Sequence, residues 1–162
     1  LANNHSMDYG LITQQKTYKI LENHNLYPIG VEKSPYQIFT DSKIVFIGAS
    51  PHKGTLSIFS KELLSNVSFF KKQGYKVVVS LHMGKEGEHE YLVKDENEIF
   101  HGQNRGNIYR LSRLLIDNGA DLIIGHGPHI TRGFELYKDR LILYSLGNFL
   151  TYGNFLLKNK LA

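Results

Sequence analysis

The chain has 162 residues, which predicts a single domain or a large part of one. Its net charge of +4 comes from scattered lysines and arginines without an interleaved aromatic stripe, so a nucleic-acid partner is not expected. The absence of cysteine excludes disulfides and thiolate metal sites, and no apolar run reaches the ~20 residues that cross a bilayer.

Helical and strand patterns alternate along the sequence. Helices are indicated by apolar residues at three- and four-residue spacing, and strands by short β-branched runs. Ser60 is a predicted N-cap, and Gly74 and Gly119 are predicted helix stops. In chain order, we expect a helix over 10–25, strands over 36–40 and 43–47, a helix over 60–73, a strand over 75–81, a helix over 104–118, a strand over 121–124, and a hairpin with strands over 134–137 and 141–144. This alternation predicts a layered α/β fold.

Two of the predicted strands run into histidine. YKVVVSL leads to His82 and DLIIG leads to His126, with His129 three residues further on. If the two strands are parallel, their histidines meet at the carboxyl edge of the sheet, where ligands bind in open α/β folds. Neutral imidazole is the commonest protein ligand for a transition metal. The sequence therefore predicts a polar site at this edge and leaves open which of His126 and His129 reaches a metal.

Other polar residues have two interpretations each. The acidic segment over 83–102 is either functional or a solvated face, and the same alternatives apply to Glu86 within it. Arg105 and Arg132 either hold an anionic substrate through bidentate contacts or are ordinary structural arginines. The histidines without such context are interpreted as surface or packing residues: His24, His52, His89 and His101.

The segment Ser-Leu-Gly-Asn over 145–148 lacks the flanking glycines of a Gly-x-Ser-x-Gly nucleophile elbow. We interpret it as a tight turn that lines the site, with Asn148 as a candidate substrate contact.

Three segments resemble the poly-γ-glutamate capsule synthesis proteins of the CapA/PgsA type, which look like members of the calcineurin-like metallophosphoesterase superfamily. They are LANNHSMDYG at 1–10, SLHMGKE at 80–86 and GADLIIGHGPHITRGFELYKDRLILYSLGNFLTYG at 119–153. Their order and spacing also match, so the resemblance covers nearly the whole chain. It implies a four-layer α/β/β/α sandwich, and we expect residues 1–162 to be one partial domain of it, truncated at both ends.

The resemblance also implies roles for individual residues. Asn4 matches a metal-ligand asparagine, and His5 matches a catalytic histidine that acts as an acid or anion binder. His82 matches a metal ligand at a strand end, and His126 and His129 stand where a Gly-His-x-His pair supplies the last ligands, here separated by two residues. The implied cofactor is one or more divalent ions of the Mn, Zn or Fe class. Because the aspartate-bearing motifs of the family are not in this chain, we expect it to bind an ion weakly or not at all.

Two functions follow from the resemblance. The first is capsule poly-γ-glutamate synthesis or export, in which the domain binds or guides an anionic polymer. The second is an active metal-dependent phosphoesterase or amide hydrolase acting on another cell-envelope substrate, with His5 as the proton donor. The implied partners are an anionic polymer or phosphoester and other capsule-synthesis membrane proteins. The implied location is extracytoplasmic, with a membrane anchor in the full-length protein and no signal or anchor in this chain.

Overall fold

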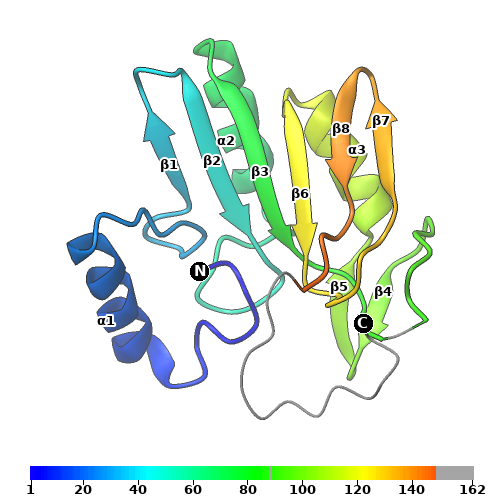
Figure 1. The fold of residues 1–162 in the computed structure, drawn as a ribbon, viewed down its shortest axis with the longest axis horizontal. Coiled ribbons are helices and arrows are strands. Elements are labelled where there is room, and N and C mark those ends of the chain that lie inside the picture. Colours follow the sequence, from blue (N-terminus) through cyan, green and yellow to red (C-terminus); the bar gives the residue numbers. More distant parts are fainter. Residues whose placement is uncertain (88, 149–162) are drawn as a thin grey trace.

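A mixed six-stranded sheet organises the computed structural model, which describes residues 1–87 and 89–148 (Figure 1). The strand order is β1-β2-β3-β6-β8-β7, and β4 and β5 form a separate two-stranded sheet. In chain order the elements are α1 (Gly10–Asn23), β1 (Tyr36–Phe39), β2 (Ile44–Ala49), α2 (Lys61–Lys72), β3 (Lys76–His82), β4 (Glu98–Phe100), β5 (Gln103–Gly106), α3 (Ile108–Asp117), β6 (Leu122–His126), β7 (Phe134–Tyr137) and β8 (Arg140–Leu143).

The four central strands β2, β3, β6 and β8 are parallel, whereas β1 and β7 pair antiparallel at the two edges. Parallel strands direct their carboxyl ends to one edge of the sheet, which is where ligands sit in open α/β folds. The expected α/β fold class is therefore confirmed, and β3 and β6 have the parallel arrangement on which the predicted site depends.

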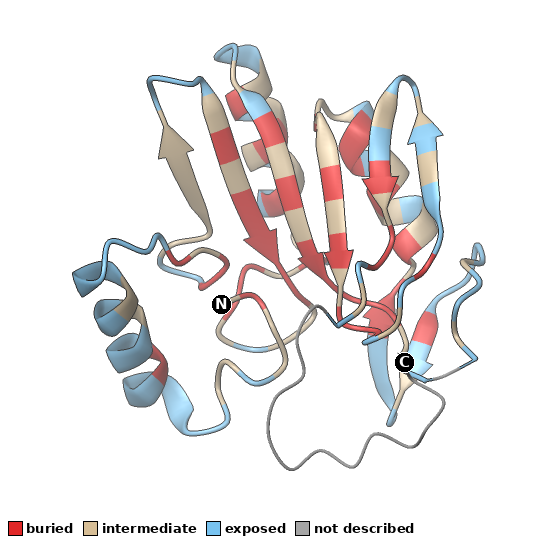
Figure 2. Cartoon of the chain, in the orientation of Figure 1, coloured by how far each residue is buried: buried red, intermediate tan, exposed pale blue. Residues whose placement is uncertain are grey.

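Helices α2 and α3 pack on the same face of the sheet (Figure 1). Along the central strands, buried residues alternate with half-buried ones (Figure 2), because successive side chains point to opposite faces. One continuous core joins helix residues such as Leu63, Val67 and Leu115 to sheet residues such as Val79 and Ile123. Each such side chain contributes about 1.5–3 kcal/mol through burial.

The opposite face of the sheet carries half-buried apolar residues, among them Phe46, Val78 and Ile124. Within the described residues, the six-stranded sheet thus carries a helical layer, α2 and α3, on one side. This arrangement is consistent with a metallophosphatase-like fold of which the chain is a piece. No helix in the described part of the chain is long and apolar enough to span a membrane.

One local expectation needs correction. Helix α3 begins at Ile108 rather than near residue 104, because Gln103–Gly106 instead pairs with β4 as strand β5. The Asn107 side chain caps α3 by accepting a hydrogen bond from the Arg110 N–H at 2.9 Å. Ser60 caps α2 as predicted, accepting from the Leu63 N–H at 3.4 Å.

Candidate functional site

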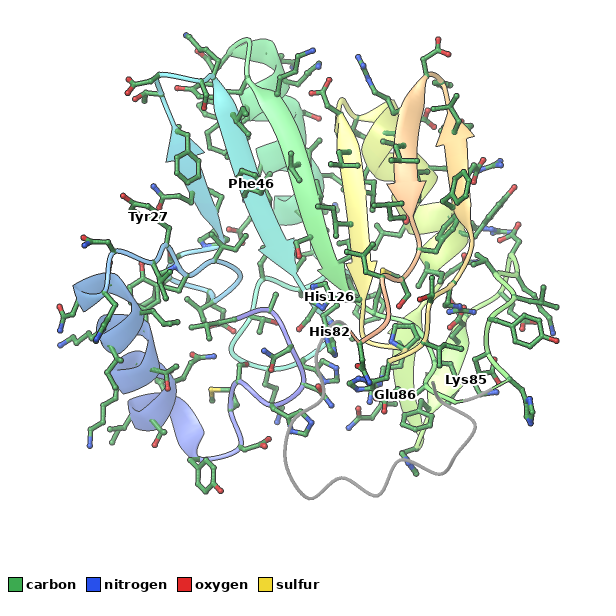
Figure 3. All side chains as sticks on the ribbon, in the orientation of Figure 1. Tyr27, Phe46, His82, Lys85, Glu86 and His126 are labelled. Atoms are coloured by element: carbon green, nitrogen blue, oxygen red, sulfur yellow. The ribbon has the colours of Figure 1, made fainter. Side chains whose placement is uncertain are left out.

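His82 and His126 lie side by side at the carboxyl edge of the sheet (Figure 3). They are the last residues of β3 and β6 and are partners in the parallel register. Their Nδ1 atoms are 3.1 Å apart, and the ring centroids are separated by 5.0 Å. The structure therefore brings together the two strand-end histidines that the sequence places at this edge.

A chain of three polar side chains couples the proton positions of this pair. The Ser80 hydroxyl lies 3.0 Å from His126 Nε2, on the other side of the ring from His82. If His126 Nδ1 donates to His82, its Nε2 accepts from Ser80 and His82 Nε2 carries a proton. In the opposite arrangement, His82 Nε2 presents a lone pair. Because each neutral ring has one N–H, Ser80, His126 and His82 change tautomer together.

Burial keeps both imidazoles neutral at ordinary pH. It lowers the pKa of His82 to about 3, with further contributions from the neighbouring His126, His52 and Arg105. Burial is also the main cause that lowers the pKa of His126 to about 4. A charged imidazole would lose its hydration here without gaining a carboxylate, so the neutral form is favoured.

His52, which the sequence places among the surface or packing residues, packs against this cluster. Its ring centroid lies 5.7 Å from that of His82, and its Nε2 atom lies 3.2 Å from Arg105 Nη1. Since a guanidinium only donates, His52 Nε2 accepts and its proton is on Nδ1. Burial and then the Arg105 charge lower the pKa of His52. The signal for this residue is its place just after β2, which is parallel to β3.

Arg105 connects the histidines to Glu86. Its side chain is 5% exposed, and Nη2 lies 3.4 Å from Glu86 Oε1. The other carboxylate oxygen of Glu86 lies 3.8 Å from His129 Nε2, and His129 Nδ1 lies 3.0 Å from Asn148 Oδ1. Glu86, Arg105, His129 and Asn148 thus form a continuous polar border beside the histidine pair. We call this border, together with Ser80, His52, His82 and His126, the histidine edge.

The N-terminal turn lies at the margin of the histidine edge. The His5 side chain is 70% exposed, and its Nδ1 lies 2.8 Å from Asp8 Oδ2. Asp8 precedes α1 and contacts His5 rather than lying in the first helical turn. Asn4 is half-buried in the same turn. The catalytic role of His5 and the ligand role of Asn4 stay predictions.

Arg132 is buried, and its charge is neutralised inside the protein. Its Nη1 atom donates to both carboxylate oxygens of Glu98, at 3.0 and 2.8 Å, and Nη2 donates to the Leu92 carbonyl at 2.5 Å. A substrate contact from Arg132 stays a prediction, and the contacts that the structure gives it are internal.

A divalent ion would need more ligands than this edge supplies. His82 Nε2 is buried and has no hydrogen-bond partner in the described residues, so it is the one imidazole nitrogen of the pair free for a ligand. Within residues 1–87 and 89–148, no group of three or more His, Asp or Glu side chains is arranged to hold an ion. The described residues therefore do not fit a complete metal centre.

Comparison with known proteins places this geometry in a family. Residues 1–152 match the bacterial capsule synthesis protein family PGA_cap. The chain is 32% identical over 171 residues to the capsule biosynthesis protein CapA of Bacillus anthracis, covering 92% of this chain and 38% of that protein. It is also 32% identical over 167 residues to the PGA biosynthesis protein CapA of Bacillus subtilis strain 168, covering 91% of this chain and 40% of that protein.

A shorter match of 67% identity over 39 residues joins it to the uncharacterized protein y4sH of Sinorhizobium fredii, covering 24% of this chain and 8% of that protein. The chain thus spans about two fifths of the length of the two CapA proteins that it matches. Because the family match extends over nearly all of the chain, the chain belongs to the PGA_cap family of bacterial capsule synthesis proteins.

Proposed function

We propose that this chain is part of a protein that acts in the synthesis of poly-γ-glutamate capsule, and that the histidine edge binds the anionic polymer. The family match and the names of the two Bacillus relatives support the capsule role. The names of these relatives suggest a cell-envelope location. We further propose that the longer protein is extracytoplasmic and membrane-anchored, with other capsule-synthesis membrane proteins as partners.

The observation that carries the binding role is a pair of buried polar atoms at the histidine edge. Arg105 Nε and His82 Nε2 both lack a hydrogen-bond partner within the described part of the chain. A buried donor left unpaired costs about 1–3 kcal/mol, so the edge gains free energy when an acceptor arrives. In the tautomer that protonates His82 Nε2, both atoms are donors, which suits a carboxylate of a polyglutamate chain.

Arg105 also supplies the charge of such a site. His82, His126 and His52 are neutral at ordinary pH because their pKa values are lowered, so they add donors rather than charge. Glu86 partly neutralises the charge of Arg105, because Glu86 Oε1 lies 3.4 Å from Arg105 Nη2. An incoming carboxylate would therefore compete with Glu86 for Arg105, and this competition favours an extended polymer that repeats the carboxylate over a single small acid.

Calorimetric titration with poly-γ-glutamate tests the proposal. Arg105→Gln removes the charge and should weaken binding about tenfold or more, because a hydrogen bond to a charged group contributes roughly 1.5–3 kcal/mol. Arg113→Gln is the matched control, since Arg113 pairs with Glu135 on β7 and is not part of the histidine edge. Binding that is absent in the wild-type chain, or equal in the two variants, contradicts the proposal.

A metal-dependent phosphoesterase or amide hydrolase acting on another envelope substrate is the second candidate. It is favoured by the metallophosphatase-like character of the family and by the free His82 Nε2, which presents a lone pair in the other tautomer. A divalent ion would polarise a phosphoryl or acyl oxygen and activate water. Because the described residues do not complete a metal centre, this function requires ligands from outside them. Phosphodiester and polyglutamate hydrolysis by the longer protein, with added Mn²⁺ or Zn²⁺, tests it.

A further inference from the structure

The carboxylate of Glu98 joins two distant parts of the chain. Glu98 is the first residue of β4 and is 6% exposed. It accepts from Arg132 Nη1 at 3.0 and 2.8 Å and from the backbone N–H of Lys85 at 2.6 Å. Its side chain thus ties the segment that follows β3 to the connection between β6 and β7.

Arg132 makes a second attachment to the same segment. Its Nη2 atom donates to the carbonyl of Leu92 at 2.5 Å, and its own backbone N–H donates to the Ser145 carbonyl at 3.0 Å. A further backbone bond runs from the Gly84 N–H to the Arg105 carbonyl at 3.2 Å. Arg132 is therefore held by the segment that follows β8, and it in turn holds the acidic segment at Leu92 and, through Glu98, at Lys85.

This arrangement fixes the position of Glu86. It follows Lys85 directly, and Figure 3 shows the two residues on the same side of the molecule as His82 and His126. When the Lys85 N–H is fixed, the Glu86 backbone is fixed on one side, and its carboxylate lies 3.4 Å from Arg105 and 3.8 Å from His129. The Lys85 ammonium instead pairs with Glu90 at 2.6 Å, so only its backbone serves Glu98.

We propose that Glu98 and Arg132 are positioning residues, which hold Glu86 at the histidine edge and so set how strongly Glu86 competes for Arg105. The inference deepens the proposed function, on which it rests for the meaning of that competition. A buried ion pair adds little net stability compared with apolar residues of the same size. An apolar pair, however, cannot accept a hydrogen bond from the Lys85 N–H or donate one to the Leu92 carbonyl. The Glu98–Arg132 pair therefore serves to hold the segment that follows β3 in place.

Amide exchange measured by NMR tests the first step without reference to any ligand. In the wild-type chain the Lys85 N–H is protected by a buried carboxylate. Glu98→Ala should speed its exchange about tenfold or more, because a hydrogen bond to a charged acceptor is lost. Amides of the sheet, such as that of Val79, should keep their protection and show that the chain is folded.

The second step is read from the imidazole resonances of His129 and His52. Glu86→Gln calibrates the shift that loss of the Glu86 charge causes. Glu98→Gln, which conserves volume, and Arg132→Met should shift both rings in the same direction as Glu86→Gln. Arg113→Met, which breaks the Arg113–Glu135 pair elsewhere, should leave them unchanged. Unshifted rings in a folded Glu98→Gln or Arg132→Met chain, or unchanged Lys85 exchange, would overturn the positioning role.

Polymer binding separates this inference from the proposed function. Displacement of Glu86 frees Arg105, so Arg132→Met should change the affinity for poly-γ-glutamate in the same direction as Glu86→Gln. Opposite changes would overturn the positioning role. If the wild-type chain binds no polymer while the His129 and Lys85 readouts respond as expected, the polymer proposal fails and the placement of Glu86 by Glu98 and Arg132 stands.

Discussion

The Nδ1 atoms of His82 and His126 lie 3.1 Å apart at the ends of two parallel strands. Two nitrogens at this distance share one proton, so one ring donates and the other accepts. Protonation of the acceptor would place two N–H groups against each other inside a buried edge. The pair is therefore a structural contact that exists only while the accepting imidazole is neutral, and this makes the stability of the chain depend on pH.

The stability of the chain should fall as the pH is lowered from about 6.5 towards 5, above the range in which most carboxylates titrate. The folded-state pKa values of His82 and His126 are lowered to about 3 and about 4 from an ordinary 6.5. The unfolded chain therefore binds more protons in this window, and the stability present above the unfolded pKa is lost on acidification. Thermal melting across the window measures the effect.

Two variants test the origin of this pH dependence: His126→Gln is the test variant and His24→Gln is its control. His126→Gln removes one titrating group of the pair and should flatten the slope. His24 is exposed, so His24→Gln should leave the slope as in the wild type. A wild-type melting temperature that is constant over the window contradicts the assignment of neutral, buried imidazoles.

His82→Ala should lower the free energy of unfolding of this chain by about 1–3 kcal/mol through lost packing and hydrogen bonding. The loss should be the same with and without a chelator, because the described residues do not complete a metal centre. A ligand would instead add stability only when its ion is present. Melting of the wild type and the variant in both conditions distinguishes the cases, and a loss abolished by chelator would make His82 a metal ligand.

Zinc and manganese should bind this chain weakly or not at all. Among the described residues, Glu86 is the one carboxylate of the histidine edge, and it faces Arg105 and His129. The imidazoles of His82 and His126 are neutral, and their Nδ1 atoms contact each other. Such a set does not offset the dehydration of a divalent ion. Calorimetric titration checks this, and a stoichiometric site with a Kd below about 1 μM would show that the chain assembles a metal centre after all.

Gly125→Ala should destabilise the chain strongly, by about 3 kcal/mol or more. A Cβ atom at Gly125 would lie 2.2 Å from the Tyr144 carbonyl oxygen, which is backbone and cannot rotate away. Gly133→Ala is the matched control, because a Cβ there meets nothing within 4 Å. Denaturant unfolding of both variants provides the comparison, and equal stabilities would mean that the chain after β8 does not pass this close to β6.

The sequence predicted the parts of the fold that local pattern determines. The runs YKVVVSL and DLIIG became β3 and β6, since short β-branched runs between polar breaks suit buried parallel strands. Helix α3 starts later than expected because the pairing of Gln103–Gly106 with β4 prevails over local helix propensity. Only non-local pairing decides such a boundary.

The composition of the histidine edge was only partly predictable. His82 and His126 were visible as strand-end residues, whereas His52 lies in a loop without a local pattern and reaches the edge through the register of β2 with β3. The contact between Arg132 and Glu98 joins residues 34 positions apart, and no spacing rule indicates it. From the sequence, Glu86 could be either a site residue or a solvated surface residue. In the structure it lies beside Arg105 and His129.

An NMR titration of the isotope-labelled chain with poly-γ-glutamate tests polymer binding at the histidine edge directly. Binding at this edge predicts saturable shifts for Arg105, Glu86 and the rings of His82 and His52, with unshifted resonances in α1 and at Arg113. It also predicts that Arg105→Gln removes these shifts while the spectrum stays that of a folded chain. Shifts confined to scattered surface lysines, or shifts at the histidine edge that persist in Arg105→Gln, would contradict polymer binding at this site.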